Sequence, residues 1–272
     1  MSVPIPIALT VAGSDSSGGA GIQADLKTFS ALHVYGASVI TALTAQNTRE
    51  VRAIHEVPAD FVRAQLAAVF ADLEIGAVKI GMLARADITS AVADFLASEC
   101  ESPVVLDPVM VSESGSALLE QGAEKVLREK LFPLADLLTP NLQEAARLLD
   151  SPLAASEEEM RAQAFSLMET GPRAVLLTGG HLPGDQAVDI LCDGTSYLRL
   201  PARRIGTRNT HGTGCTLSAA VAAFLAHGAS MRDAVSRAKA YLGEALAHAD
   251  ALQVGSGAGP VHHFHALWKE GS

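Results

Sequence analysis

The sequence predicts an α/β fold in which a central, mostly parallel sheet is covered by helices on both faces. Two features of the 272-residue chain predict it. Short apolar runs alternate with longer segments of helical periodicity, and polar residues or glycines cluster after the runs. This alternation is typical of parallel sheets, which bind ligands at the carboxyl ends of their strands. Without internal repeats or a clear linker, we expect one domain over residues 1–272.

The first strand and helix frame a glycine-rich loop. Residues 5–12 form a short apolar run, and the loop at 13–21 that follows holds four glycines. From Ile22 onward, apolar residues recur every three or four positions, which indicates an amphipathic helix. The loop has the glycine spacing of a P-loop but lacks its Lys and Ser or Thr, so we do not expect a Walker A motif.

The same two patterns, short apolar runs and helical periodicity, locate the remaining strands and helices. Polar residues follow the second strand at 46–48, and Pro140, Asn141 and Glu144 open a helix after the fifth strand. A hairpin is expected over 190–200, around Asp193 and Gly194. The other expected strands are at 39–43, 78–80, 104–107, 137–139 and 174–177, and the other expected helices are at 60–73, 87–98, 121–131, 157–169, 231–249 and from Cys215 onward.

Composition and charge narrow the class of protein. A formal net charge of −10 argues against binding to a nucleic-acid backbone. No apolar run reaches membrane-spanning length, and the first run lacks the basic flank of a signal peptide. The three cysteines are far apart and form no metal-binding pair. We therefore expect a cytoplasmic protein with neither nucleic acid nor membrane as partner.

A stretch of small residues, 209–216, runs into an apolar helix. The free N–H groups and the positive dipole end of that helix would lie at Gly212 to Cys215, which is a favourable place for a phosphate. The alternative is that Gly212 and Gly214 only make a tight turn into a core helix. Gly212 and Gly214 do not continue as a dinucleotide fingerprint either, because Leu217 stands where its third glycine belongs.

Cys215 is expected to be reactive, because a thiol at a helix N-terminus has a lowered pKa. It could act as a base towards a substrate alcohol during phosphoryl transfer, or as a nucleophile on a carbonyl. A hydrolase would need His211 as its base. A kinase would need acids that hold a metal, and Asp107 and Glu144 are available for that.

Asp107 and Glu144 each follow a predicted strand and could hold a hydrated Mg²⁺ that bridges nucleotide phosphates. The alternative is a solvated loop acid and an ordinary acid in the first turn of a helix. His262, His263 and His265 have no Cys or carboxylate nearby, so we expect no metal there.

Eight segments together carry the pattern of a known family. The chain resembles the hydroxymethylpyrimidine/phosphomethylpyrimidine kinases of thiamine biosynthesis, which are ribokinase-like enzymes, over nearly its full length. The segments are AGSDSSGGAGIQADLK at 12–27, ITALTAQNT at 40–48, KIGML at 79–83, DPVMV at 107–111, TPNLQEA at 139–145, and the stretches 179–182, 209–219 and 259–265.

The resemblance implies a three-layer ribokinase-like domain and an ATP- and Mg²⁺-dependent activity. The γ-phosphoryl group would pass to the alcohol of 4-amino-5-hydroxymethyl-2-methylpyrimidine, and a second one to the resulting monophosphate. Such families are usually homodimeric. A pyridoxal kinase of the same fold is the alternative, because a pyridoxal ring would fit similarly.

The resemblance also implies roles for individual residues. Cys215 resembles the catalytic base, and the N–H groups of Gly212, Thr213 and Gly214 resemble the anion hole. Asp107 and Glu144 resemble the acids that organise Mg²⁺ and phosphate. The nucleotide would contact Asn141, Glu144, Thr178, Gly180 and Arg208, and the pyrimidine would contact Gly13, Asp15, Ala20, Thr44, Gln46, Met82 and Val109. The amide of Gln46 suits an aminopyrimidine because it both donates and accepts hydrogen bonds.

Two positions depart from the pattern. Thr178 and Glu113 stand where the family commonly has lysine, so two positive charges near the phosphates are missing. Their absence is expected to slow the second transfer, with Arg208 as a partial replacement. These two residues also suggest a non-catalytic pyrimidine-binding protein. Separately, Cys215 with His211 as base leaves a cysteine hydrolase as a further alternative.

Overall fold

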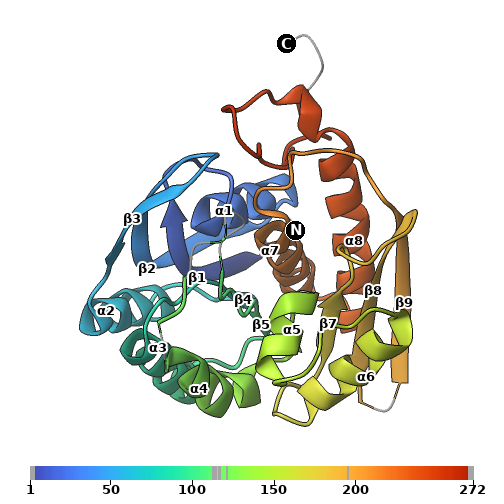
Figure 1. Cartoon of the computed structure of the whole chain (residues 1–272). Helices are drawn as coiled ribbons and strands as arrows, with labels where there is room; N and C mark the ends of the chain where they lie inside the picture. Colours follow the sequence, from blue (N-terminus) through green and yellow to red (C-terminus); the bar gives the residue numbers. More distant parts are fainter. Residues whose placement is uncertain (1–3, 112–114, 116–117, 121, 195, 269–272) are drawn as a thin grey trace.

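The computed structural model describes residues 4–111, 115, 118–120, 122–194 and 196–268. Its nine strands form one sheet with the order β3-β2-β1-β4-β5-β6-β7-β8-β9 (Figure 1). The strands are β1 Ile7–Asp15, β2 Tyr35–Gln46, β3 Val51–Glu56, β4 Ala77–Ile80, β5 Val104–Leu106, β6 Leu137–Leu138, β7 Val175–Thr178, β8 Gln186–Asp193 and β9 Ser196–Arg203.

The centre of the sheet is parallel and its edges are antiparallel. Strands β2, β1, β4, β5, β6 and β7 pair in parallel, whereas β3 on one edge and β8 and β9 on the other run antiparallel. The mostly parallel sheet and the hairpin expected at 190–200 are thus confirmed. The expected strands did not include β3, because its residues are all exposed or half-buried and show no apolar alternation.

Helices cover both faces of the sheet, which gives three layers (Figure 1). On one face lie α1, α7 and α8, and on the other lie α2 to α6. The helices are α1 Gly21–Ala31, α2 Ala59–Phe70, α3 Ala86–Glu99, α4 Ala123–Val126, α5 Leu142–Leu148, α6 Glu157–Met168, α7 Thr213–Ala226 and α8 Met231–Ala247.

Alternate residues of the strands supply the two cores. On β1, Leu9 and Val11 pack into the cluster under α2 to α6, whereas Ala8 packs into the cluster under α1, α7 and α8. On β5, Val104 and Leu106 face the first cluster and Val105 faces the second. This period of two explains why the central strands appear in the sequence as continuous apolar runs.

Several expected bounds differ from the structure. Strand β1 continues to Asp15 and β2 to Gln46, so polar residues expected in loops form the last rungs of strands. The helix expected at 121–131 is α4 followed by a π-helical turn, Leu127–Leu131, and position 121 lies outside the described residues. Helix α7 begins at Thr213, two residues before the expected start. Among the described residues, no helix has both the length and the apolarity to cross a membrane.

Candidate active site

A cavity of about 740 Å³ opens at the carboxyl ends of the parallel strands. This volume suits a small-molecule site. All the site residues expected from the sequence line the cavity except Arg208. The lining residues that were expected are Gly13, Asp15, Ala20, Thr44, Gln46, Met82, Asp107, Val109, Asn141, Glu144, Thr178, Gly180, Gly212, Thr213, Gly214 and Cys215.

The N-terminus of α7 points into this cavity from the stretch 209–216. Gly212 is the N-cap and has φ +81°, a left-handed conformation that suits glycine. A Cβ at Gly212 would overlap the carbonyl oxygen of Gly19, so glycine is also required for space. The backbone N–H of Thr213 donates to the carbonyl of Thr210 at 3.1 Å, and its hydroxyl donates there at 2.5 Å. The Thr213 N–H that was expected in the anion hole is therefore already engaged.

The thiol of Cys215 does not have the lowered pKa that its position at a helix N-terminus suggests. Burial raises the pKa of Cys215 to about 12, and the carboxylates of Asp25 and Asp107 add to the rise. The positive charge of Lys79 and a hydrogen bond from the N–H of Gly21 lower this pKa, but by less than the other effects raise it. Desolvation is the largest of these influences, and the expectation of a partly ionised thiol at neutral pH is wrong for the protein without ligands.

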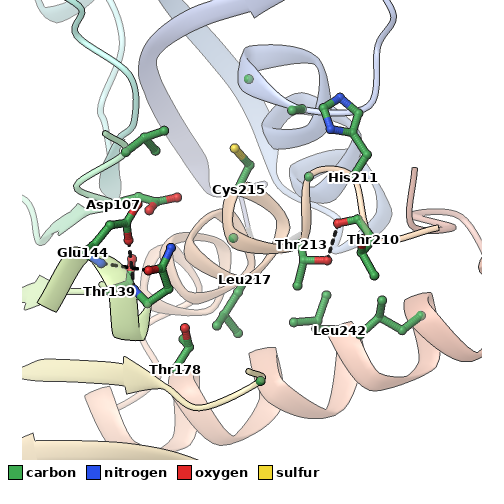
Figure 2. A pocket seen from close by; sticks show the side chains of 18 of the residues that line it. Asp107, Thr139, Glu144, Thr178, Thr210, His211, Thr213, Cys215, Leu217 and Leu242 are labelled. Atoms are coloured by element: carbon green, nitrogen blue, oxygen red, sulfur yellow. Dashed lines mark hydrogen bonds between the residues drawn. The ribbon is translucent and has the colours of Figure 1, made fainter. Parts of the chain in front are cut away.

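Asp107 and Glu144 lie on one side of the first turn of α7, and His211 lies on the other (Figure 2). Both acids are buried. Burial raises the pKa of Asp107 to about 6, although Lys79 and a hydrogen bond from Ser218 at 3.1 Å oppose the rise. Burial and the charge of Asp107 raise the pKa of Glu144 to about 8. Two buried acids that disfavour each other's charge make a place where a cation would be stabilised.

The donor set fits Mg²⁺ held together with nucleotide phosphates. Mg²⁺ is usually bound by one or two carboxylates plus phosphate oxygens and waters, and Asp107 and Glu144 supply such a pair. Within the described part of the chain, no group of three or more His, Cys, Asp or Glu side chains could hold a metal ion alone.

Helix α5 fixes the orientation of Glu144. Asn141 is its N-cap, and its side-chain oxygen accepts the N–H of Glu144 at 2.9 Å. The carboxylate of Glu144 accepts the N–H of Asn141 at 2.9 Å in return, which completes a capping box. The two dashed lines near Glu144 in Figure 2 mark this pair of bonds. Two residues expected to serve the nucleotide thus also start the helix that carries them.

Asp15 ties the loop after β1 to the stretch 209–216. Its carboxylate accepts hydrogen bonds from the N–H and hydroxyl of Ser17, from the N–H groups of Gly19 and Ala20, and from His211 at 2.9 Å. Burial alone would raise the pKa of Asp15, but the hydrogen bonds from His211, Ser17 and Ala20 hold it at about 2. Because Nε2 of His211 binds Asp15, this ring nitrogen does not serve Cys215 as a hydrolase would require.

Residues of β7, β9 and α8 line another part of the cavity, where the nucleotide was expected. Thr178 ends β7 and lies opposite Asp189 on β8. Arg208 is exposed and does not line the cavity, so it does not replace a lysine at 178. Arg203 and Arg204 line the cavity instead. Glu113, the other departure from the family pattern, lies outside the described residues.

Two lysines that line the cavity were not among the expected site residues. Lys239 on α8 donates to Asp189 at 2.6 Å. Asp189 is the residue of β8 that pairs with Thr178 of β7. Lys79 on β4 is fully buried beneath the cavity and binds both carboxylate oxygens of Asp25, at 2.9 and 2.8 Å. A lysine in an apolar strand run and one in an amphipathic helix both look like ordinary residues, because their partners lie 54 and 50 positions away along the chain.

Comparison with known proteins agrees with this geometry. A family model described as phosphomethylpyrimidine kinase matches residues 15–262. Two hydroxymethylpyrimidine/phosphomethylpyrimidine kinases are similar over nearly their whole length. The one from Rhizobium meliloti is 59% identical over 97% of this chain and 99% of its own. The one from Escherichia coli is 56% identical over 96% of this chain and 98% of its own.

The fold is also similar to solved kinase structures. A pyridoxal kinase from Staphylococcus aureus, in complex with AMP-PCP and pyridoxal, superposes with a TM-score of 0.89. It is 32% identical in sequence, and the match covers 97% of this chain and 96% of that one.

Proposed function

This chain belongs to the phosphomethylpyrimidine kinase family, and from that premise we propose that it phosphorylates 4-amino-5-hydroxymethyl-2-methylpyrimidine and then its monophosphate with ATP, in thiamine biosynthesis. Its three-layer fold is the ribokinase-like one that the resemblance implies. The observation that carries the proposal is the shared cavity of the α7 N-terminus, the Cys215 thiol and the acid pair Asp107 and Glu144.

In the first transfer the substrate hydroxyl oxygen attacks the γ-phosphorus of ATP, the bond from that phosphorus to the β,γ-bridging oxygen breaks, and ADP leaves. In the second transfer a phosphate oxygen of the monophosphate is the nucleophile. Cys215 is the proposed base that takes the hydroxyl proton, and it must be a thiolate to do so. Lys79 is the buried cation that favours this form. The first turn of α7 is proposed to stabilise negative charge on the transferring group.

We propose that Asp107 and Glu144 hold Mg²⁺ with the nucleotide phosphates. When bound, the ion would neutralise charge that develops on the phosphates. Asn141 would contribute by keeping Glu144 in place through the capping box.

A coupled assay of ADP release tests the activity. We expect ADP release by the purified protein with the pyrimidine alcohol and with its monophosphate, and its loss when Mg²⁺ is chelated. Absence of ADP release with the alcohol would contradict the proposed function.

Pyridoxal kinase is the second candidate, and the similarity to the pyridoxal-bound Staphylococcus aureus enzyme favours it. The ratio of kcat/KM for the pyrimidine alcohol to that for pyridoxal separates the two functions. A ratio well above one makes pyridoxal a side substrate, and a ratio below one reverses the assignment.

We further propose that residues 1–272 form one domain that assembles as a homodimer in the cytoplasm. Exposed large apolar side chains support self-association: Tyr35 on β2 and Phe61 on α2 are each 60% exposed. The unpaired thiols of Cys100, Cys192 and Cys215 agree with a reducing compartment. Light scattering on a sizing column gives the oligomeric mass, which should be twice that of the chain.

A further inference from the structure

Four side chains form a hydrogen-bonded row along the wall of the cavity. Nε2 of His211 lies 2.9 Å from the Asp15 carboxylate and 3.4 Å from the Gln46 amide. The other end of that amide lies 3.1 Å from the hydroxyl of Thr44, which donates to the carbonyl of Ser14 at 2.9 Å. His211 and Asp15 are 8% and 3% exposed, whereas Thr44 and Gln46 are half-buried and line the cavity.

The donors and acceptors of this row permit one orientation of the Gln46 amide. Asp15 is ionised and only accepts, so Nε2 of His211 carries a hydrogen. In the structure the amide nitrogen of Gln46 lies on the His211 side and its oxygen on the Thr44 side, so two N–H donors face each other and the hydroxyl of Thr44 would need two hydrogens. A half-turn of the amide removes both conflicts, because the two ends of the group have nearly the same shape. The carbonyl of Gln46 then faces His211 and its NH₂ faces Thr44.

The ring of His211 is itself held in place. Asp15 binds it and also binds the N–H groups of Gly19 and Ala20. Gly19 packs so closely on the ring that a Cβ there would overlap it. A ring fixed by a buried carboxylate and a backbone contact can act as a rigid reference for its neighbour Gln46.

We propose that His211 is a positioning residue that turns the carbonyl of Gln46 toward the N-terminus of α7, and that this orientation aims the substrate alcohol at Cys215. This inference rests on the proposed function. In the aminopyrimidine the ring nitrogen N3, the 4-amino group and the 5-hydroxymethyl group follow one another around the ring. The Gln46 carbonyl accepts from the amino group and its NH₂ donates to N3, so the hydroxymethyl group lies beyond the amino group, on the His211 side.

The chain itself continues from His211 into Gly212, Gly214 and Cys215, where the phosphoryl group would be transferred. The opposite amide orientation would place the ring nitrogen on the His211 side and turn the alcohol away from α7. His211 thus links recognition of the pyrimidine to the place of reaction.

A pair of substrates tests this role. The 4-oxo analogue presents N3–H and a C4 carbonyl, which is the reverse hydrogen-bond pattern of the aminopyrimidine. The test compares kcat and KM for both alcohols in the wild type, His211→Leu and His211→Gln. In His211→Leu the amide can rotate, so the preference in kcat/KM for the amino substrate should fall about tenfold or more. His211→Gln keeps an N–H donor at similar reach and should restore most of the preference.

Two further variants complete the test. His227→Leu removes another histidine whose ring nitrogen binds a carbonyl, that of Leu32 at 2.9 Å, and should leave the preference unchanged. Thr44→Val removes the partner at the other end of the amide, so it should lower the preference even where His211→Leu fails to fold.

Loss of kcat/KM by the same factor on both substrates, with the preference intact in both His211→Leu and Thr44→Val, would show that the row is only structural and would overturn the inference. Failure of the wild type to release ADP with the aminopyrimidine would instead refute the proposed function, so the two failures are distinct.

Discussion

Two opposing effects act on the thiol of Cys215. The N-terminus of α7 favours the charged thiolate, and desolvation disfavours it. Because its pKa is raised to about 12, very little thiolate exists at neutral pH in the protein without ligands. A base with a high pKa is strong once it has formed but scarce.

We therefore expect slow alkylation of Cys215 by iodoacetamide at pH 7 and a rate that rises with pH up to at least 9. Mass spectrometry of the labelled peptide measures this rate, with Cys215→Ala as the blank. Cys215→Ala should also lower kcat by about 10²- to 10⁴-fold, the usual contribution of a general base. Rapid labelling at pH 7 would contradict the raised pKa.

Thr178 carries no positive charge at the end of β7, and the nearby Lys239 is already paired with the buried Asp189 opposite it. Thr178→Lys should raise kcat/KM for the monophosphate several-fold more than for the alcohol, since the monophosphate brings extra negative charge into the cavity. Thr178→Met is the control of similar length without charge. An equal change for both substrates would remove the argument from charge.

At the scale of elements, α5 gives Glu144 two tasks, the capping box and the proposed metal site. Glutamine can keep a capping box but carries no charge, so Glu144→Gln separates the two tasks. We expect this variant to keep the helix and to lose most Mg²⁺-dependent activity.

The raised pKa of Glu144 gives a second, pH-dependent expectation. A carboxyl whose pKa rises from 4.5 to about 8 on folding makes the folded state less stable as pH increases through that interval. In metal-free buffer Glu144→Gln should therefore have a higher Tm than the wild type at pH 8 and nearly the same Tm at pH 4.5. Thermal unfolding at the two pH values measures this, and a lower Tm at pH 8 would contradict the raised pKa.

At the scale of the whole molecule, the pair of Lys79 and Asp25 joins β4 to α1 inside the protein. Both side chains are fully buried, and Thr10 on β1 donates to Asp25 at 2.6 Å. Removal of one partner leaves a buried charge without compensation, which costs more than removal of both.

Lys79→Met should thus lower the free energy of unfolding by about 3–5 kcal/mol. The double variant Lys79→Met with Asp25→Leu should recover part of that loss. Urea unfolding measures both, and additive losses in the double variant would show that the two charges do not depend on each other.

The order of strands and helices could be predicted because burial on both faces leaves continuous apolar runs, as in Val104–Leu106. Strand β3, Val51–Glu56, could not be predicted, because it is an exposed edge strand and has no continuous apolar face. The place of Asp107 and Gln46 in one cavity could be predicted because parallel strands end at one edge of the sheet, whereas the other expected contacts followed from the family resemblance. The pKa of Cys215 and the partners of Lys79 depend on contacts between distant parts of the chain, which no local pattern records.

The backbone contact between Gly19 and Gly212 has a consequence for how this protein can vary. A methyl group at Gly212 would overlap the carbonyl of Gly19, and one at Gly19 would overlap the ring of His211. Neither position can accept a side chain while its neighbour stays in place. In a library randomised at both positions and selected for growth without thiamine, survivors should carry glycine at both, and this pair should be among the least tolerant in the chain.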